Sequence, residues 1–337
     1  MNEMEENGAA GPAEHRLCVA PMMDWTDRHF RFFLRLLSPN ARLYTEMVTA
    51  QAVAHGDRER LLGYHADEHP VALQLGGSDP ALLAAAARVG EAFGYDEINL
   101  NVGCPSDRVR SGRFGACLMA EPALVRDCVA AMSEAVSVPV TVKTRIGIDD
   151  QDDYGFLAGF VDTVAGSGCR TFIVHARKAI LSGLSPKENR EIPPLRYGHV
   201  HRLAQEFPGL HIVLNGGIRD VDTVEEECRR LDGVMIGREA YHNPYFVAEA
   251  DRALFGTELP DREDVVARFI PYVEARLAEG LRLSAMTRHI LGLFAGRPGA
   301  RRWRRTLSEG CARPARDAAV IRLALEEVSD ALARAVS

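Results

Sequence analysis

Short runs of apolar and β-branched residues alternate with segments of helical spacing along most of this chain. Eight of these runs are candidate strands: Arg16–Met22, Ala41–Met47, Pro70–Gly77, Glu97–Gly103, Pro139–Arg145, Thr171–Arg177, His211–Gly217 and Gly233–Arg238. Strands that are apolar almost throughout and alternate with helices are typical of a parallel sheet covered by helices. Eight units in about 240 residues predict an α/β fold of the closed (β/α)8 TIM barrel class better than an open doubly wound sheet. No G-x-G-x-x-G motif follows an early strand, which weakens the dinucleotide-binding alternative further.

Segments of helical spacing lie between the candidate strands. They are Asp27–Leu37, Asp79–Gly94, Ala123–Val136, Asp153–Ser167, Val200–Phe207 and Val221–Leu231. After about Gly256 only helical segments follow: Glu263–Ala278, Ser284–Phe294, Ala300–Leu307 and Asp317–Ala335. We therefore expect a loose tail over residues 1–15, a barrel over residues 16–256 and a smaller all-helical C-terminal domain over residues 257–337.

Composition and cysteine usage limit the class of protein. With 47% apolar residues among 337, the chain can bury one large core. No apolar run approaches the roughly 18–20 residues of a membrane span, and the acidic start is unlike a secretion signal. The seven cysteines form no C-x-x-C pair and no Cys/His cluster, so neither a disulfide framework nor a metal site is indicated. We expect a cytoplasmic protein.

Basic residues are concentrated in one part of an otherwise acidic chain. The net charge of −7 argues against a protein that coats nucleic acid indiscriminately. Between Leu281 and Ser308, however, there are seven arginines and no carboxylate: Arg282, Arg288, Arg297, Arg301, Arg302, Arg304 and Arg305. This segregation leaves two interpretations open, a solvated basic helix face and a surface that faces a polyanion.

Polar residues at the ends of the candidate strands carry most of the chemistry, because active sites of such barrels form at the C-terminal ends of the strands. The candidates in chain order are Pro21, Met22 and Met23, then Gln74, Lys143 and Arg145, His175 and Arg177, Asn215, Gly216 and Gly217, and finally Gly237 and Arg238. Together they form a cationic, hydrogen-bonding set with two glycine-bearing strand ends side by side.

The two glycine-bearing ends, after the seventh and eighth strands, indicate a phosphate site. Glycines there let backbone N–H groups approach an anion, although tight turns alone would also favour glycine. Lys143 could stabilise a ring that gains negative charge, or it could simply extend toward water. His175 could equally be a hydrogen-bonded histidine of the barrel rim. A phosphorylated heterocycle across the barrel mouth would suit the set, and flavin mononucleotide (FMN) is the obvious candidate.

Cys104 lies between Gly103 and Pro105, directly after the strand that contains "EINLNVG". A glycine and a proline on either side predict a rigid turn that presents the thiol, whereas a buried cysteine in a core strand is usually a small apolar filler.

Several motifs resemble the tRNA-dihydrouridine synthase family, and most closely its A-type branch, which acts on positions 20 and 20a of the D-loop. They are "APMMDWTDRHFR", "LYTEMV", "HPVALQLGG", "EINLNVGCPSDRV", "FGACLM", "VTVKTRIGIDD", "LSGLSPKENREIPPL", "NGGI" and "MIGREAYHNP". The match runs from about Arg16 to the end of the barrel and, through "RHILGLFAGRPGARRWRRTLSE", into the helical domain.

The resemblance implies a role for each matching residue. Cys104 would be the general acid. The residues lining FMN would be Pro21, Met22, Met23, Gln74, Lys143, His175, Asn215, Gly216, Gly217, Gly237 and Arg238. The residues facing the RNA would be Asn101, Arg145, Arg177, Lys187, Arg190, Arg301, Arg302, Arg304 and Arg305.

The reaction implied by the resemblance is a two-step reduction. NADPH reduces the flavin and leaves, and the target uridine is extruded from the tRNA into the barrel mouth. Hydride adds to uracil C6 and Cys104 delivers a proton to C5. We expect tRNA as the partner, no metal and a monomer.

Two other functions remain open. Another FMN barrel, such as a dihydroorotate dehydrogenase, also places a cysteine beside a pyrimidine, but a free base does not explain the arginines of the helical domain. A non-catalytic RNA-binding barrel does not explain why Gln74, Cys104, Lys143 and His175 occur together with both glycine turns.

Overall fold

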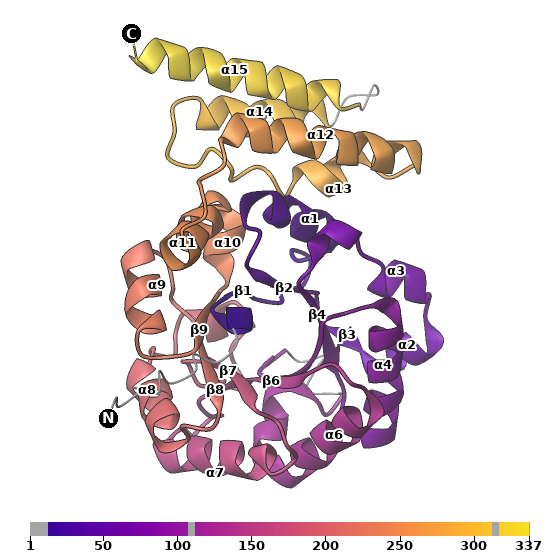
Figure 1. Ribbon diagram of the computed structural model, residues 1–337, viewed down its shortest axis with the longest axis vertical. Coiled ribbons are helices and arrows are strands. Elements are labelled where there is room, and N and C mark those ends of the chain that lie inside the picture. Colours follow the sequence, from indigo (N-terminus) through magenta and orange to yellow (C-terminus); the bar gives the residue numbers. More distant parts are fainter. Residues whose placement is uncertain (1–12, 107–111, 312–316, 337) are drawn as a thin grey trace, which may run out of the picture.

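The computed structural model describes residues 13–106, 112–311 and 317–336 and contains a closed barrel with a helical domain beside it (Figure 1). Within these residues one parallel sheet runs through β1 (Leu17–Val19), β2 (Arg42–Tyr44), β3 (Val48–Thr49), β4 (Val71–Gly76), β5 (Glu97–Val102), β6 (Val140–Arg145), β7 (Thr171–His175), β8 (His211–Asn215) and β9 (Gly233–Ile236). The sheet closes because β1 pairs with both β2 and β9, and β2 pairs with β4. The predicted TIM barrel is therefore confirmed, with β3 as a short addition alongside β4.

Helices surround the barrel (Figure 1), and six of them lie where the sequence spacing predicts them, whereas those at Ala50–His55, Arg58–Leu62, Arg238–His242 and Tyr245–Phe255 were not predicted. The barrel helices are α1 (Arg28–Leu37), α2 (Ala50–His55), α3 (Arg58–Leu62), α4 (Pro80–Phe93), α6 (Pro122–Ala135), α7 (Tyr154–Ala165), α8 (Tyr197–Glu206), α9 (Val221–Cys228), α10 (Arg238–His242) and α11 (Tyr245–Phe255). Aspartate caps begin several of them: Asp27 accepts from the backbone N–H groups of His29 and Phe30, and Asp79 accepts from that of Leu82.

The interior of the barrel is divided into an apolar and a polar part. The apolar cluster comprises Cys18, Ala20, Tyr44, Ala72, Ile173, Val213 and Met235. Buried polar side chains project from β4, β5 and β6 instead: Gln74, Glu97, Asn99, Asn101 and Thr141. The other apolar strand residues pack outward against the helices in the main core.

The C-terminal region is helical, as predicted, and contains α12 (Arg262–Ala278), α13 (Leu283–Thr287), α14 (Ala300–Gly310) and α15 (Ala319–Val336). It packs against the side of the barrel formed by α1, α10 and α11 (Figure 1). Phe32 of α1 stacks on Tyr272 of α12 with ring centroids 4.0 Å apart. In the described part of the chain, no helix combines the length and apolar character needed to cross a membrane.

The predicted helix Ser284–Phe294 is only partly present. α13 ends at Thr287, and residues 288–299 form turns and a bend. Gly292 explains part of this difference, because its backbone lies against that of His242 and an added Cβ would be 2.3 Å from the His242 carbonyl oxygen. Close packing of this segment on the end of α10 therefore prevails over the helical spacing of its apolar residues.

The predicted loose tail is wrong at its C-terminal end, while residues 1–12 lie outside the described residues. His15 is buried, and its Nε2 lies 2.6 Å from the buried carboxylate of Glu97. Glu14 lies 3.2 Å from Arg42 of β2. A carboxylate inside a barrel requires polar partners, so this end of the tail belongs to the barrel floor.

Candidate active site

The predicted polar residues of the strand ends meet at one rim of the barrel. In the strand register Asn101 lies opposite Lys143, Arg145 opposite His175, and His175 opposite Asn215. The Lys143 ammonium donates to Asn215 Oδ1 at 3.0 Å. Asn215 Nδ2 donates in turn to the Met235 carbonyl at 2.8 Å, so the amide orientation of Asn215 is set from both ends.

The turn after β8 requires its glycines. Gly216 and Gly217 have φ values of 109° and 78°, in the region that side chains disfavour. A Cβ on Gly216 would be 2.5 Å from His175 Cδ2, and one on Gly217 would be 2.5 Å from Leu195 Cδ1. Tyr197 holds the turn by donating to the Gly216 carbonyl at 2.6 Å. The exposed backbone of this turn forms a surface that a small anion can approach.

Cations crowd the rim beside this turn. Burial and then the charge of Arg145 lower the pKa of Lys143 to about 7. Burial and the cations Arg145, Lys143 and Arg177 hold the pKa of His175 well below its usual range. Arg238 is 2.5 Å from Glu191, a carboxylate on the loop between β7 and α8. Positive groups that suppress one another's protonation would be stabilised by a bound anion.

The Cys104 thiol is free, partly exposed and held on a fixed turn. Asn101 Oδ1 accepts from the backbone N–H groups of Gly103 and Cys104 at 3.1 and 3.0 Å. From the other side, Arg145 Nε donates to the Gly103 carbonyl at 2.8 Å. The predicted rigid turn is therefore present, and the end of the motif, residues 107–109, lies outside the described residues.

A glycine turn, a cationic rim and a fixed thiol thus occur together at one end of the barrel. Comparison with known proteins shows the family to which the chain belongs. A family model described as dihydrouridine synthase (Dus) matches residues 18–332. The chain belongs to the dihydrouridine synthase family. The resemblance of its motifs to this family is thereby confirmed.

Curated members of the family match nearly the whole chain. The tRNA-dihydrouridine(20/20a) synthase of Xanthomonas campestris is 63% identical over 299 residues, covering 89% of each chain. The protein of the same name from Salmonella typhimurium is 58% identical over 329 residues, covering 97% of this chain and 98% of the relative.

Among solved structures, morphinone reductase is similar, with a TM-score of 0.50 and 13% identity over 73% of this chain and 87% of its own. That likeness concerns the fold alone.

Asn101 and Arg145 face inward in this family member. Their exposed fractions are 8% and 3%. Besides Gly103, Arg145 binds the carbonyls of Lys178 and Asn189 at 3.0 Å each, and so positions the loop between β7 and α8. Both residues have positioning contacts, and their expected contact with RNA stays a prediction.

The other residues expected at the RNA lie on the loop after β7. Lys187 and Arg190 are both exposed: Lys187 directly precedes a short 3-10 turn, Glu188–Arg190, and Arg190 is its last residue. Arg177 donates to the carbonyls of Glu191 and Pro193 and thereby closes this loop onto the rim.

At the end of β1, Met22 is half-buried and Met23 is 54% exposed. A residue that the sequence interpretation missed lies beside them: Glu46 accepts the Asp24 backbone N–H at 2.5 Å, and burial raises the pKa of its carboxyl. Its position directly after the second strand, inside "LYTEMV", was the available signal. Leu195, which covers the glycine turn, carried no such signal.

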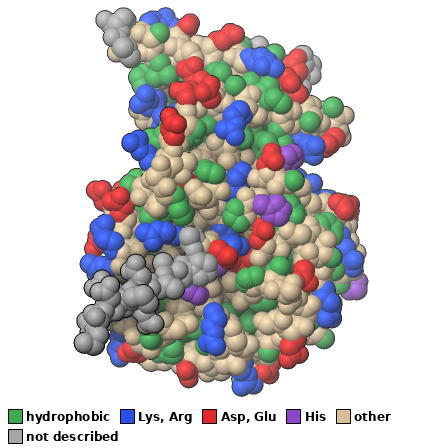
Figure 2. All heavy atoms as spheres, in the orientation of Figure 1, with side chains coloured by type: hydrophobic (Ala, Val, Ile, Leu, Met, Phe, Trp, Pro, Cys, Tyr) green, Lys and Arg blue, Asp and Glu red, His purple; other side chains and the backbone are tan. Residues whose placement is uncertain are grey.

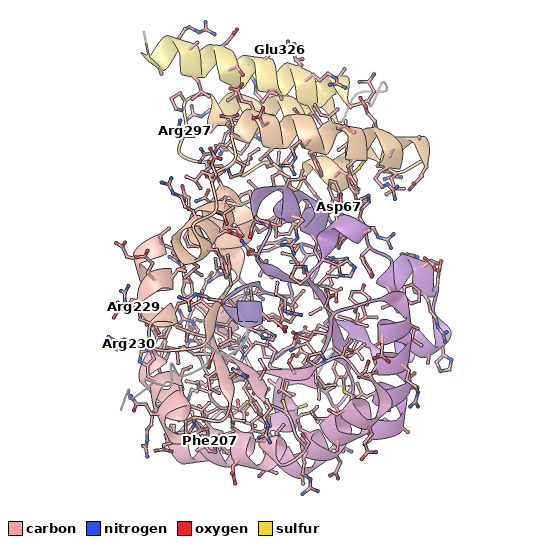
Figure 3. All side chains as sticks on the ribbon, in the orientation of Figure 1. Asp67, Phe207, Arg229, Arg230, Arg297 and Glu326 are labelled. Atoms are coloured by element: carbon pink, nitrogen blue, oxygen red, sulfur yellow. The ribbon has the colours of Figure 1, made fainter. Side chains whose placement is uncertain are left out.

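Four arginines of the helical domain gather in one groove of about 540 Å³ at the start of α14. They are Arg297, Arg301, Arg302 and Arg304. Arg297, labelled in Figure 3, comes from the segment before α14. Arg305 lies 3.9 Å from Glu309 instead, and Arg288 forms an ion pair with Asp27 at 2.5 Å.

On the face shown in Figure 2, basic side chains are scattered among acidic ones over both domains. The groove, lined by four arginines, is a local basic feature of a chain with a net charge of −7.

Proposed function

We propose that this protein reduces uridine to 5,6-dihydrouridine at positions 20 and 20a of tRNA in the cytoplasm, with FMN as bound cofactor and NADPH as reductant. The observation that carries the proposal is the pairing of a glycine turn and cationic rim with the fixed Cys104 thiol at one barrel mouth. The names of the relatives, which match most of the chain, identify the substrate class.

The residues of the rim fit FMN. Gly216 and Gly217 adopt positive φ values in a turn whose exposed backbone a phosphate can approach, and Arg177 and Arg238 supply positive charge at the same rim. The other residues expected around the cofactor are Pro21, Met22, Met23, Gln74, Lys143, His175, Asn215 and Gly237. When bound and reduced, the flavin supplies the hydride that adds to C6 of uracil.

The chain's own residues perform the second half of the reduction. Once C6 has received hydride, negative charge develops over C5 and O4 of the uracil, and a proton must reach C5. Cys104 is the group proposed to deliver it, because Asn101 and Arg145 hold the turn that presents its thiol. Lys143 and the neutral His175 would stabilise and orient polar groups of the cofactor.

The tRNA would bind across the mouth and the helical domain. Lys187 and Arg190 on the β7 to α8 loop, together with Arg301, Arg302 and Arg304 of the groove, supply positive charge for phosphates. The target base is extruded, because C5 and C6 of a stacked base are out of reach of the barrel interior.

The proposal is tested by reducing the FMN-loaded protein anaerobically with NADPH, removing the excess, and adding unmodified tRNA. Visible absorption then follows flavin reoxidation. Cys104→Ala should slow reoxidation by tRNA about 100-fold or more while leaving reduction by NADPH unchanged.

Cys311→Ala provides the matched control, because Cys311 is also a half-buried free thiol but lies in the helical domain. Reoxidation by fumarate or orotate instead of tRNA would identify a dehydrogenase. A protein that takes up no flavin would refute the redox function itself.

A further inference from the structure

The inside of the barrel contains a line of polar side chains, of which the proposed reaction uses only Gln74 and Asn101. Barrel interiors are usually filled by bulky apolar residues. Here five polar side chains of β4, β5 and β6, each at most 8% exposed, run through the interior: Gln74, Glu97, Asn99, Asn101 and Thr141. Buried polar groups are costly unless they are hydrogen-bonded, so their partners define what this line does.

Each member of the line donates to the next one toward the barrel floor. At the mouth, Asn101 Nδ2 donates to Gln74 Oε1 at 2.8 Å. Gln74 Nε2 donates to Asn99 Oδ1 at 2.8 Å, and Asn99 Nδ2 donates to Thr141 Oγ1 at 2.7 Å. The Thr141 hydroxyl finally donates to Glu97 Oε1 at 2.5 Å.

Both ends of this line of hydrogen bonds impose the same direction of donation, from the barrel mouth to the barrel floor. At the upper end, Asn101 Oδ1 accepts two backbone N–H groups, those of Gly103 and Cys104, which can only donate. At the lower end, the Glu97 carboxylate can only accept. Reversing any one amide would therefore place two donors or two acceptors face to face in a buried site, which is unfavourable.

The lower end is itself held by two further hydrogen bonds and one ion pair. His15 Nε2 lies 2.6 Å from Glu97 Oε2, the Tyr44 hydroxyl donates to Oε1 at 2.8 Å, and the Arg42 guanidinium forms an ion pair with Oε2 at 3.3 Å. These partners compensate the buried charge of Glu97, so the end of the chain stays an acceptor.

We infer that this one-way chain of hydrogen bonds sets the orientation of the Gln74 amide toward the cofactor, with Glu97, Thr141 and Asn99 as positioning residues. The inference rests on the proposed function, in which Gln74 lines the flavin. With its Oε1 bound to Asn101 and one Nε2 hydrogen bound to Asn99, Gln74 keeps one lone pair and one hydrogen for a ligand. A heterocycle edge can donate to the free lone pair of Oε1 and accept the free hydrogen of Nε2. A reversed amide would exchange the positions of this acceptor and this donor.

The chain also connects Gln74 to the Cys104 turn. Asn101 binds both, so its amide orientation is shared between the cofactor side and the proton donor. Losing the Thr141 hydroxyl would leave Asn99 without its acceptor, so Asn99 could reverse and Gln74 would lose the partner that fixes its amide from below. Asn101, held by the N–H groups of Gly103 and Cys104, would then be the one anchor left for the Gln74 amide.

The test compares Thr141→Val, which keeps the shape but removes the hydroxyl, with Thr141→Ser, which keeps the hydroxyl. Thr144→Val is the control on the same strand, because Thr144 is fully buried on the opposite face and its hydroxyl contacts only the Arg145 carbonyl among the described hydrogen bonds. FMN is titrated into each FMN-free protein, and the visible circular dichroism of the bound flavin is recorded.

We expect the FMN dissociation constant of Thr141→Val to rise about tenfold, the effect of one misplaced hydrogen bond, with an altered flavin dichroism. Thr141→Ser and Thr144→Val should stay within about twofold of the wild type, even where Thr144→Val loses comparable thermal stability. Unchanged FMN affinity and dichroism in Thr141→Val would overturn the inference.

A second measurement does not depend on a variant that folds. In the FMN-free wild type, labelled with 15N, the side-chain amide protons of Gln74, Asn99 and Asn101 should exchange slowly with water, because the chain is complete without cofactor. Rapid exchange of all three would also overturn the inference. If the wild type fails to bind FMN, the proposed function is refuted, whereas the exchange experiment still reports on the chain.

Discussion

Lys143 illustrates how one residue is changed by its surroundings. Its ammonium lies at the rim, where the Asn215 amide oxygen is its one hydrogen-bond partner among the described residues, and burial and Arg145 lower its pKa from 10.5 to about 7. A lysine that loses its proton this easily is matched to an anionic ligand, since a bound phosphate or a reduced ring would restore the charge. The residue type was predictable from the strand end, but its altered proton affinity was not.

Lys143→Met should remove a pH dependence of stability. Between pH 7 and about 10 the unfolded chain keeps the Lys143 proton and the folded protein does not, so the folded state of the wild type gains stability as pH rises. The difference in free energy of unfolding, wild type minus variant, should therefore increase across this window in the FMN-free protein. Urea unfolding at several pH values measures it, and a difference independent of pH would contradict the lowered pKa.

The turn after β8 shows that the residues around an element can also determine which amino acids it tolerates. Gly216→Ala should lower the free energy of unfolding of the FMN-free protein by about 1–3 kcal/mol, because φ is 109° and the new Cβ would meet His175 at 2.5 Å. Gly198→Ala is the control, since this glycine lies in α8 with nothing within 4 Å of an added Cβ. It should keep or slightly raise stability. Equal thermal unfolding of both variants would contradict this account of the turn.

The arginines at the start of α14 should contribute to the affinity for tRNA. Arg301→Ala combined with Arg302→Ala should weaken tRNA binding and lower the slope of log affinity against log salt by about 1.5, with FMN affinity unchanged. Arg229→Ala with Arg230→Ala removes the same charge from the barrel flank, away from the helical domain (Figure 3). That pair should change the slope little. Filter binding over a range of salt concentrations measures both, and equal slopes would remove the groove from the RNA interface.

At the scale of the whole molecule, polar contacts tie the two domains together. Asp27, which caps α1, accepts from Arg288 at 2.5 Å and lies 3.0 Å from His289 in the helical domain. His29 Nδ1 lies 2.7 Å from the Tyr272 hydroxyl of α12, and burial lowers the pKa of His29 to about 4. The interface therefore requires a neutral His29.

Acidification should weaken this interface. Between pH 6.5 and 4 the unfolded chain binds a proton at His29 that the folded protein does not, so stability falls as pH falls through that window. His29→Gln keeps an acceptor for Tyr272 but cannot be protonated, and its thermal unfolding temperature should decline less between pH 7 and 5. Parallel profiles for the wild type and the variant would exclude His29 as the cause.

Much of the architecture followed from local patterns. Apolar runs and helical spacing report which residues are buried, so the closed barrel, most of its helices and the helical C-terminal region were predictable. The rim residues Lys143, His175 and Asn215 were also predictable, because parallel strands bring all their C-terminal ends to one rim of a barrel. The Cys104 turn was visible in its flanking glycine and proline.

The sequence by itself thus determined the types of element and the residues of the rim. Only the tertiary structure decided which side chains meet. The line from Asn101 to Glu97 depends on the pairing register of β4, β5 and β6, and the groove at α14 depends on how the helical domain folds. His15 and Glu97 are far apart in the chain, and local spacing holds no information about such a contact. Burial is a local property of a sequence pattern, whereas hydrogen-bond partners are set by register and packing.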